Sequence, residues 1–293
     1  EDTVTGAYCN EFVLPSYKNV PKTKEQAEIQ PLKTQKATLQ KASYSTGDER
    51  LYFKFYCGER VGEKLLNQAI KPIVDELEAN NLINKWFFIR YADKNGHHLR
   101  FRIHLYNQTK FSECVLIIKK HIQPFENNLL IWKTQTDTYL RELQRYGFES
   151  IDTTEELYYN DSEATVKFAD LIEGDAGERV RWLFSLLSMD HLLNDFGFNV
   201  KQKMQLLNAA KTSFGKEFNK TGALNKQVNE LYSENMSNIE AFLNEDAIAD
   251  MYEPLWDILK ERSVKNKTVI SQLKSLAEQN ILPGGLENTV LSY

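Results

Sequence analysis

Residues 86–105 read Trp-Phe-Phe-Ile-Arg-Tyr-Ala-Asp-Lys-Asn-Gly-His-His-Leu-Arg-Phe-Arg-Ile-His-Leu, and this stretch decides the fold. Trp86–Tyr91 is an aromatic and β-branched run, which is typical of a strand. Residues 93–96, Asp-Lys-Asn-Gly, have the composition of a tight turn. His98–Leu105 then alternates polar and apolar side chains, as strands do. The stretch therefore predicts an antiparallel β-hairpin.

The alternation gives the second strand of this hairpin two different faces. Its polar face carries two histidines and two arginines, namely His98, Arg100, Arg102 and His104, and Arg90 lies on the partner strand. These side chains either form a solvated face paired with surface carboxylates, or line a pocket for an anion such as a carboxylate. Spacing alone favours the solvated face, because antiparallel sheets commonly have one wet face.

The rest of the first half mixes strands and helices. Strand character is predicted for residues 11–16, Leu51–Cys57 and Leu129–Leu143. Helical periodicity covers Glu63–Asn80, with a kink expected at Pro72, and Phe111–Phe125, with an end expected at Pro124. The Lys-, Gln- and Thr-rich residues 18–48 read as a loop or linker.

The second half shows helical periodicity almost throughout. The predicted helices are Glu163–Ile172, Glu178–Phe196, Val200–Phe214, Ala223–Leu243, Ile248–Ser263 and Thr268–Gln279. The sequence therefore predicts an α+β fold with an antiparallel sheet, in which residues 1–150 are strand-rich and residues 151–293 are mainly helical. We treat residues 1–293 as one domain.

Composition and motifs exclude several function classes. A net charge of -5 argues against a general nucleic-acid binder. No apolar run is long enough to span a bilayer. The sequence has no P-loop, no GxGxxG, no HExxH and no nucleophile elbow. Asp161 and Glu163 lack calcium-loop spacing, and His191, in an apolar helix, is interpreted as a packed residue. We expect no metal and no cofactor.

Three cysteines lie far apart in the sequence, at Cys9, Cys57 and Cys114. They form no metal-binding spacing, and three unpaired thiols indicate a reducing, cytoplasmic location. The chain begins at Glu1 without an initiator Met and stops just after an apolar pattern starts, at Leu291–Tyr293. Both ends look cut, so we expect a fragment or a processed chain.

Several segments, taken in order, resemble one known family. The specific part is Arg90-Tyr91-x-Asp93 followed by His98-Leu-Arg-x-Arg102. The matching segments around it are Leu51–Tyr56, Arg141–Gly147, Glu156, Asp161-Ser162 and Ser188–Asp190. Together they resemble the C-terminal domain of lantibiotic dehydratases, which also occurs alone as the thiopeptide-type bacteriocin biosynthesis protein. The resemblance covers roughly residues 10–290.

The resemblance implies a lyase. In that family, a larger N-terminal domain glutamylates Ser and Thr of a ribosomal precursor peptide, using glutamyl-tRNA. The C-terminal domain then eliminates glutamate and leaves dehydroalanine or dehydrobutyrine. The implied partners are a glutamylated precursor peptide and a separate or fused glutamylation domain. Dimers are common in the family, so a homodimer is also expected.

The resemblance also implies roles for particular residues. Arg100, Arg102 and Arg141 match the arginines that stabilise the enolate and the departing carboxylate, an anion chemistry that suits guanidinium groups. Arg90, Arg145 and Tyr91 are expected to bind the substrate.

The family also places a histidine acid or base after an apolar run near its C-terminus. Here the matching run is Val290–Tyr293, and the chain ends there. His98 is then the nearest candidate by position.

Two other functions stay open. Stand-alone relatives include pyridine-forming cyclases of thiopeptide pathways, although retention of Arg100, Arg102 and Arg141 argues against that reading. A non-catalytic partner that holds the leader peptide of a dehydratase complex is the other alternative.

Overall fold

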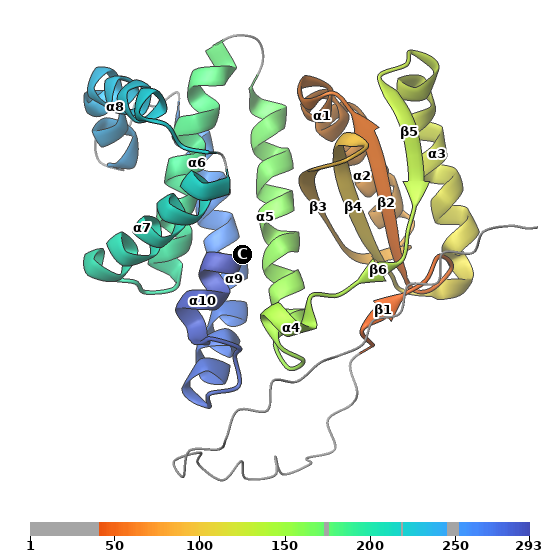
Figure 1. The fold of residues 1–293 in the computed structure, drawn as a ribbon. Coiled ribbons are helices and arrows are strands. Elements are labelled where there is room, and N and C mark those ends of the chain that lie inside the picture. The colour runs from red at the N-terminus through yellow and green to blue at the C-terminus, as the bar shows by residue number, and fades with distance from the viewer. Residues whose placement is uncertain (1–40, 173–175, 218, 245–251) are drawn as a thin grey trace, which may run out of the picture. The chain divides into compact units, whose positions relative to one another are not determined.

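The computed structural model of the chain describes residues 41–172, 176–217, 219–244 and 252–293. These residues form the predicted α+β fold (Figure 1). The strand predicted over 11–16, Cys9 and most of the loop predicted over 18–48 lie outside the described residues. Among the helices that the structure describes, none is both long and apolar enough to cross a membrane.

The main sheet is antiparallel, with its four strands in the order β3-β4-β2-β5. The strands are β2 (Arg50–Cys57), β3 (Ile83–Asp93), β4 (Gly96–Leu105) and β5 (Ile131–Thr136). A second, two-stranded sheet pairs β1 (Ser43–Tyr44) with β6 (Tyr139–Leu140). The strand character predicted over Leu129–Leu143 is therefore divided between β5 and β6, each in a different sheet.

The predicted hairpin is formed by β3 and β4. Asp93 pairs with Gly96, so only two residues close the turn. The backbone N–H of Asn95 donates to the Asp93 carboxylate at 2.7 Å, which holds the turn as an Asx motif. Gly96 has φ +111°, a conformation that side chains with a Cβ rarely adopt. The local chemistry read from the sequence thus decides this part of the fold.

Helices cover the apolar face of the sheet. They are α1 (Glu59–Leu65), α2 (Lys71–Ala79) and α3 (Phe111–Asn127), and a short 3-10 turn at Gln108–Lys110 precedes α3. Leu99, Phe101, Ile103 and Leu105 of β4 pack with these helices in one buried apolar cluster. The period of two in the sequence therefore assigns the apolar face of this strand correctly.

A π-helical turn, η1 (Leu66–Ile70), joins α1 to α2 immediately before Pro72. In this turn the Lys71 N–H donates to the Leu66 carbonyl, five residues back. A proline lacks an N–H and crowds the carbonyl four residues earlier, so a wider turn there relieves the conflict. The disturbance predicted at Pro72 thus takes the form of a π turn within a longer helical segment.

The end predicted for α3 at Pro124 is wrong. The helix continues to Asn127, with Pro124 inside its last turns. Proline removes one donor to the carbonyl of Lys120, but Lys120 is exposed, so water can take that bond. Phe125, one residue later, is buried in the core, and this packing favours continuing the helix.

The second half is helical, as predicted, after a short turn of helix, α4 (Leu143–Tyr146). Its helices are α5 (Ile151–Leu171), α6 (Ala176–Asp195), α7 (Val200–Glu217), α8 (Gly222–Leu243), α9 (Glu253–Glu278) and α10 (Gly285–Ser292). Figure 1 shows α5 running between the sheet and the other helices, and α5 contacts both β3 and α9. This helix therefore connects the two halves.

Two helix predictions in this half are wrong. The helix predicted to start at Glu163 begins at Ile151, and the two helices predicted over Ile248–Ser263 and Thr268–Gln279 are one continuous helix from Glu253. Both errors have one physical cause. The Asn160 side chain, on α5, donates to the Asn266 side chain, on α9, at 2.9 Å, and both are buried. Buried polar residues interrupt the apolar periodicity from which the helices were predicted.

Candidate functional site

The sheet face opposite α2 and α3 carries a cluster of charged and aromatic residues that we call the arginine face. It comprises Arg50, Tyr52, Lys54 and Tyr56 on β2, paired with His104, Arg102, Arg100 and His98 on β4. The solvated-face interpretation is wrong for two of its β4 residues. His98 is only 3% exposed and Arg102 only 7%. Buried charge of this kind needs a compensating partner, so the partners of each residue matter.

Arg102 lies in a cage of aromatic rings. Its guanidinium carbon is 4.8 Å from the centroid of Tyr52, 4.9 Å from that of Tyr139 and 5.2 Å from that of Phe87. Within the described residues it forms no hydrogen bond and no ion pair, and its Nε is buried without an acceptor. Ring quadrupoles compensate a guanidinium charge only partly. An anion would complete this environment.

Arg100 is held by its neighbours on the hairpin. Its guanidinium carbon lies 3.4 Å from the centroid of the Tyr91 ring, and its Nε donates to His98 Nε2 at 3.3 Å. Tyr91 itself is 47% exposed. The Arg100 end of the arginine face is thus closer to solvent than the Arg102 end, while the orientation of Arg100 is fixed.

His98 has both ring nitrogens engaged. Nδ1 lies 3.2 Å from the carbonyl of Gly96, and Nε2 accepts from Arg100, so the ring carries its proton on Nδ1. The Tyr56 ring packs against it with centroids 4.6 Å apart. Burial lowers the pKa of His98 below its ordinary value, which keeps the ring neutral. This geometry suits a residue that orients Arg100 better than one that transfers protons.

Arg141 is buried in an ion-pair network. Its Nε donates to Glu155 at 2.8 Å, and it also pairs with Asp152. Arg50 pairs with the same two carboxylates, and the Tyr139 hydroxyl donates to Glu155 at 2.7 Å. Although burial disfavours the charged form, Glu155 raises the pKa of Arg141 above its ordinary value. Arg141 is thus bound by carboxylates of the chain itself, and it positions the Tyr139 ring beside Arg102.

His104 shares a small cavity with Arg102, Tyr139 and Glu155. The cavity holds about 10 Å³, on the order of one water molecule. Within the part of the chain that the structure describes, His104 Nδ1 is buried and has no hydrogen-bond partner. Burial, aided by the charges of Arg50 and Lys85, lowers the pKa of His104 to about 4. The residue therefore offers a neutral ring beside Arg102. The alternation of β4 predicts that His104 lies on this face, but only the structure shows the burial and the neighbouring charges that lower its pKa.

Arg90 and Arg145 do not join the arginine face. Arg90 pairs with Leu99 across the hairpin, so it projects to the opposite side of the sheet. There it lies 3.8 Å from Glu63. Arg145 is an exposed residue of α4 whose guanidinium pairs with Glu142 at 2.8 Å. The expectation that both support one site with Arg100 and Arg102 is not met by these positions.

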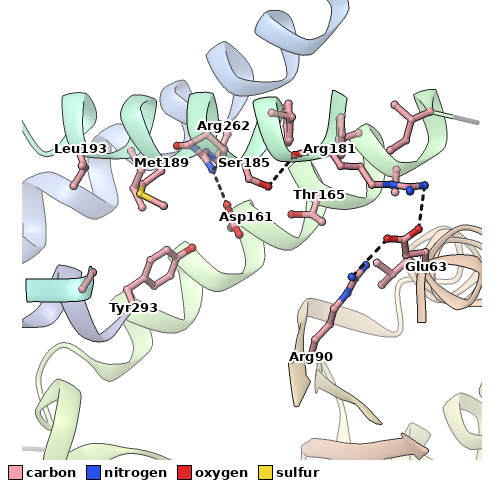
Figure 2. Close-up of a pocket in the computed structure, with 18 of the residues that line it drawn as sticks. Glu63, Arg90, Asp161, Thr165, Arg181, Ser185, Met189, Leu193, Arg262 and Tyr293 are labelled. Carbon is pink, nitrogen blue, oxygen red and sulfur yellow. Dashed lines mark hydrogen bonds and ion pairs between the residues drawn. The ribbon is translucent and has the colours of Figure 1, made fainter. Parts of the chain in front are cut away.

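Arg90 instead borders a large cavity of about 1150 Å³. Residues of α1, η1, β3, α5, α6, α7, α9 and α10 line it. Figure 2 shows Arg90 and Arg181 on either side of Glu63 near one end, and Asp161, Arg262 and Tyr293 farther along. Sequence reasoning missed this cavity because its lining comes from segments spread over more than half of the chain.

The remaining expectations concern single residues. Within the described ranges, no group of histidine, cysteine and carboxylate side chains could hold a metal ion. The His191 ring packs edge-on against Trp256, with centroids 4.8 Å apart, so the predicted packing role is confirmed. Cys57 and Cys114 are buried free thiols, and burial raises the pKa of Cys114 to about 11.

Known structures share the fold. The tRNA-dependent lantibiotic dehydratase MibB from Microbispora sp. 107891 aligns with a TM-score of 0.61 at 17% identity, over 85% of this chain and 25% of its own. TsrL aligns with a TM-score of 0.57 at 15% identity, over 80% of this chain and 70% of its own. The pyridine synthase TbtD from thiomuracin biosynthesis aligns with a TM-score of 0.55 at 12% identity, over 84% of this chain and 89% of its own. At these identities the likeness shows the fold alone.

The sequence comparisons are more specific. No curated protein matches the chain. The chain spans about a quarter of the length of MibB. The profile of one family, described as the C-terminal part of the lantibiotic biosynthesis dehydratase, matches residues 51–293. The match begins at residue 51, later than the resemblance near residue 10 had suggested. The chain belongs to the family of lantibiotic biosynthesis dehydratase C-terminal domains, which connects it with the modification of ribosomal peptides.

Proposed function

We propose that this chain is a lyase that eliminates glutamate from glutamylated Ser or Thr of a precursor peptide. The observation that carries the proposal is Arg102, a buried guanidinium with no anionic partner among the described residues. A charge held in this way is costly unless a ligand completes it. The family membership of residues 51–293 supports a peptide as the ligand.

In the proposed reaction a base removes the α-proton of the modified residue. The electron pair left on Cα forms the Cα=Cβ double bond, and the Cβ–O bond breaks with its electrons on the glutamate carboxylate. Negative charge develops first on the adjacent peptide carbonyl as an enolate and then on the leaving group. Arg100 and Arg102 are adjacent on one face of β4, and fixed guanidinium groups there stabilise both charges.

The other residues of the site position these two arginines. His98 orients Arg100 through Nε2. Arg141 positions Tyr139 through Glu155, and Tyr139 packs against Arg102. The cavity beside Arg102 is only about 10 Å³. The substrate would therefore enter from the more exposed end, past Tyr91 and Arg100.

We assign the proton acceptor to His104, acting through a water molecule in the cavity of about 10 Å³ that it shares with Arg102. Its Nδ1 has no partner among the described residues, and its lowered pKa keeps the ring unprotonated at neutral pH. His98 shares the arginine face, but both of its nitrogens are engaged. Substituting each histidine by Gln separates the two roles. His104→Gln should abolish turnover, whereas His98→Gln should leave a slower enzyme whose Arg100 is less well oriented.

The proposal is tested with a synthetic glutamylated peptide, with mass spectrometry following the loss of glutamate. Arg102→Gln should slow the reaction by about a hundredfold or more, the loss typical of removing one transition-state donor. Lys167→Gln is a matched control, since Lys167 forms an exposed ion pair with Glu261 away from the arginine face. If the wild-type chain binds the peptide and leaves it unchanged, a non-catalytic peptide-binding role replaces the lyase.

A further inference from the structure

The large cavity bordered by Arg90 is distinct from the arginine face. Its volume of about 1150 Å³ exceeds the 300–1,000 Å³ of ordinary small-molecule pockets. None of the residues of the arginine face lines it, and Arg90 shares a sheet face with Leu99 rather than with Arg102. A ligand that fills this cavity is larger than a free amino acid.

One end of the cavity carries excess positive charge. Glu63 pairs with two guanidinium groups, that of Arg181 at 3.0 Å and that of Arg90 at 3.8 Å (Figure 2). One carboxylate between two arginines leaves a net charge of +1. Arg60 and Lys64 lie on the same helix as Glu63 and also line the cavity, and neither has an ion-pair partner within the described residues. This end is therefore complementary to carboxylates.

The other wall of the cavity is apolar and open to solvent. Large side chains that line it remain well exposed, namely Met189, Leu207, Phe214 and Leu291. Phe214, on α7, is 57% exposed. Exposed apolar residues gathered in a hollow with a polar rim are typical of binding surfaces. The cavity thus combines a cationic end with an apolar wall.

We propose that this cavity binds an acidic peptide segment rich in apolar side chains. Carboxylates of the segment would pair with Arg90 and Arg181, and its apolar side chains would cover Leu207 and Phe214. The inference rests on the proposed function for one point, that the segment belongs to the precursor peptide. Nucleic acid fits less well, because a mildly acidic chain with an apolar wall lacks the basic surface that phosphates require.

Binding is measured by fluorescence anisotropy, using the full chain and a fluorescein-labelled peptide of Leu, Phe and Glu. A second peptide carries Gln in place of each Glu. The Glu peptide should bind about tenfold more tightly at low salt, and this preference should disappear in the Arg90→Gln/Arg181→Gln variant. Phe214→Ala should weaken both peptides, because it removes only apolar contact. Lys226→Gln, on the exposed face of α8, is the control and should bind like the wild type.

Equal affinity for the Glu and Gln peptides would overturn the proposal. Undiminished binding by Phe214→Ala and by Arg90→Gln/Arg181→Gln would also overturn it. So would displacement of the peptide by free glutamate at a similar concentration, because that would indicate a site for small anions. The elimination assay is run on the same proteins. Peptide binding without glutamate release by the wild-type chain would leave this inference standing and refute the lyase. Glutamate release that is unchanged by Phe214→Ala and by Arg90→Gln/Arg181→Gln would refute this inference and leave the lyase standing.

Discussion

The guanidinium of Arg100 stacks on the ring of Tyr91, with its central carbon 3.4 Å from the ring centroid. Tyr91 pairs with His98 across the β3–β4 hairpin, so Arg100, two residues farther along β4, is its diagonal neighbour, and Arg100 Nε also donates to His98 Nε2. This arrangement gives the more open end of the arginine face a fixed cation.

Tyr91 tests this arrangement directly. Tyr91→Phe keeps the stacked ring and should retain most of the elimination rate. Tyr91→Ala removes a contact of about 0.5–1 kcal/mol at an exposed site, and we expect a fall in rate of several-fold. The comparison is made from kcat and KM with the glutamylated peptide. Equal rates for the Phe and Ala variants would show that stacking does not orient Arg100.

The network around Glu155 predicts a large stability effect. Glu155 is only 2% exposed and accepts from Arg141, Arg50 and Tyr139. Glu155→Gln leaves two buried arginines short of a carboxylate, so unfolding in urea should show a loss of about 3–5 kcal/mol. Glu261→Gln removes an exposed carboxylate and should change stability by less than about 0.5 kcal/mol. Similar losses in both variants would contradict the network's role.

The His104 pKa predicts how stability depends on pH. In the folded chain its pKa is lowered to about 4, whereas a free histidine titrates near 6.5. Below pH 6.5 the unfolded chain therefore takes up the proton more readily, and stability falls as the pH drops towards 4. The loss should be about 1–2 kcal/mol, after discounting for solvent around the half-buried ring.

The matching experiment compares the wild-type chain with His104→Gln across this pH range. Carboxylates titrate in both proteins, so the difference between their unfolding free energies isolates His104. That difference should be constant above pH 6.5 and should change in favour of the variant below it. A difference that does not change with pH would mean that His104 titrates alike in the folded and unfolded chains.

Gly96 predicts a backbone effect at the hairpin turn. Its φ is +111°, and an added Cβ would lie 3.2 Å from the Trp132 ring. Gly96→Ala should therefore destabilise the chain by about 1–3 kcal/mol. Gly62, within α1, has an ordinary φ, and among the described residues no atom outside its own helical turn lies within 4 Å of an added Cβ. Gly62→Ala should be neutral or stabilising by about 0.4–1 kcal/mol in thermal unfolding. Equal effects at the two glycines would contradict the strained turn.

The sequence predicts the parts of this molecule that depend on local chemistry. The turn before Gly96, the two faces of β4 and most helices of the second half follow from residue type and period. The hairpin arginines could also be identified, because strand alternation places Arg100 and Arg102 together. By contrast, the partners of Arg141 come from α5, whose first turns contain buried polar residues such as Thr154 and Glu155. These polar residues interrupt the apolar periodicity of the helix, so the sequence reveals neither the start of the helix nor the ion-pair network to which it contributes.

The positions of the other site residues depend on long-range packing. Arg90 is one residue away from Tyr91, yet the pleat turns it to the opposite side of the sheet, towards Glu63. The cavity there needs α6 and α7 to pack near α1, and no local pattern specifies that approach. The type of each residue predicts its chemistry. The strand register and the packing of the helices decide to which site the residue belongs.

The proposed lyase cleaves the Cβ–O bond of a glutamylated residue by elimination. The most direct measurement follows free glutamate and peptide mass together in one reaction of the wild-type chain with a glutamylated peptide. Elimination predicts one dehydroalanine or dehydrobutyrine for each glutamate released, with Arg102→Gln slowing both equally. Glutamate release that restores Ser or Thr would reveal hydrolysis, and a peptide that keeps its glutamate would reveal no cleavage; either result would contradict the account.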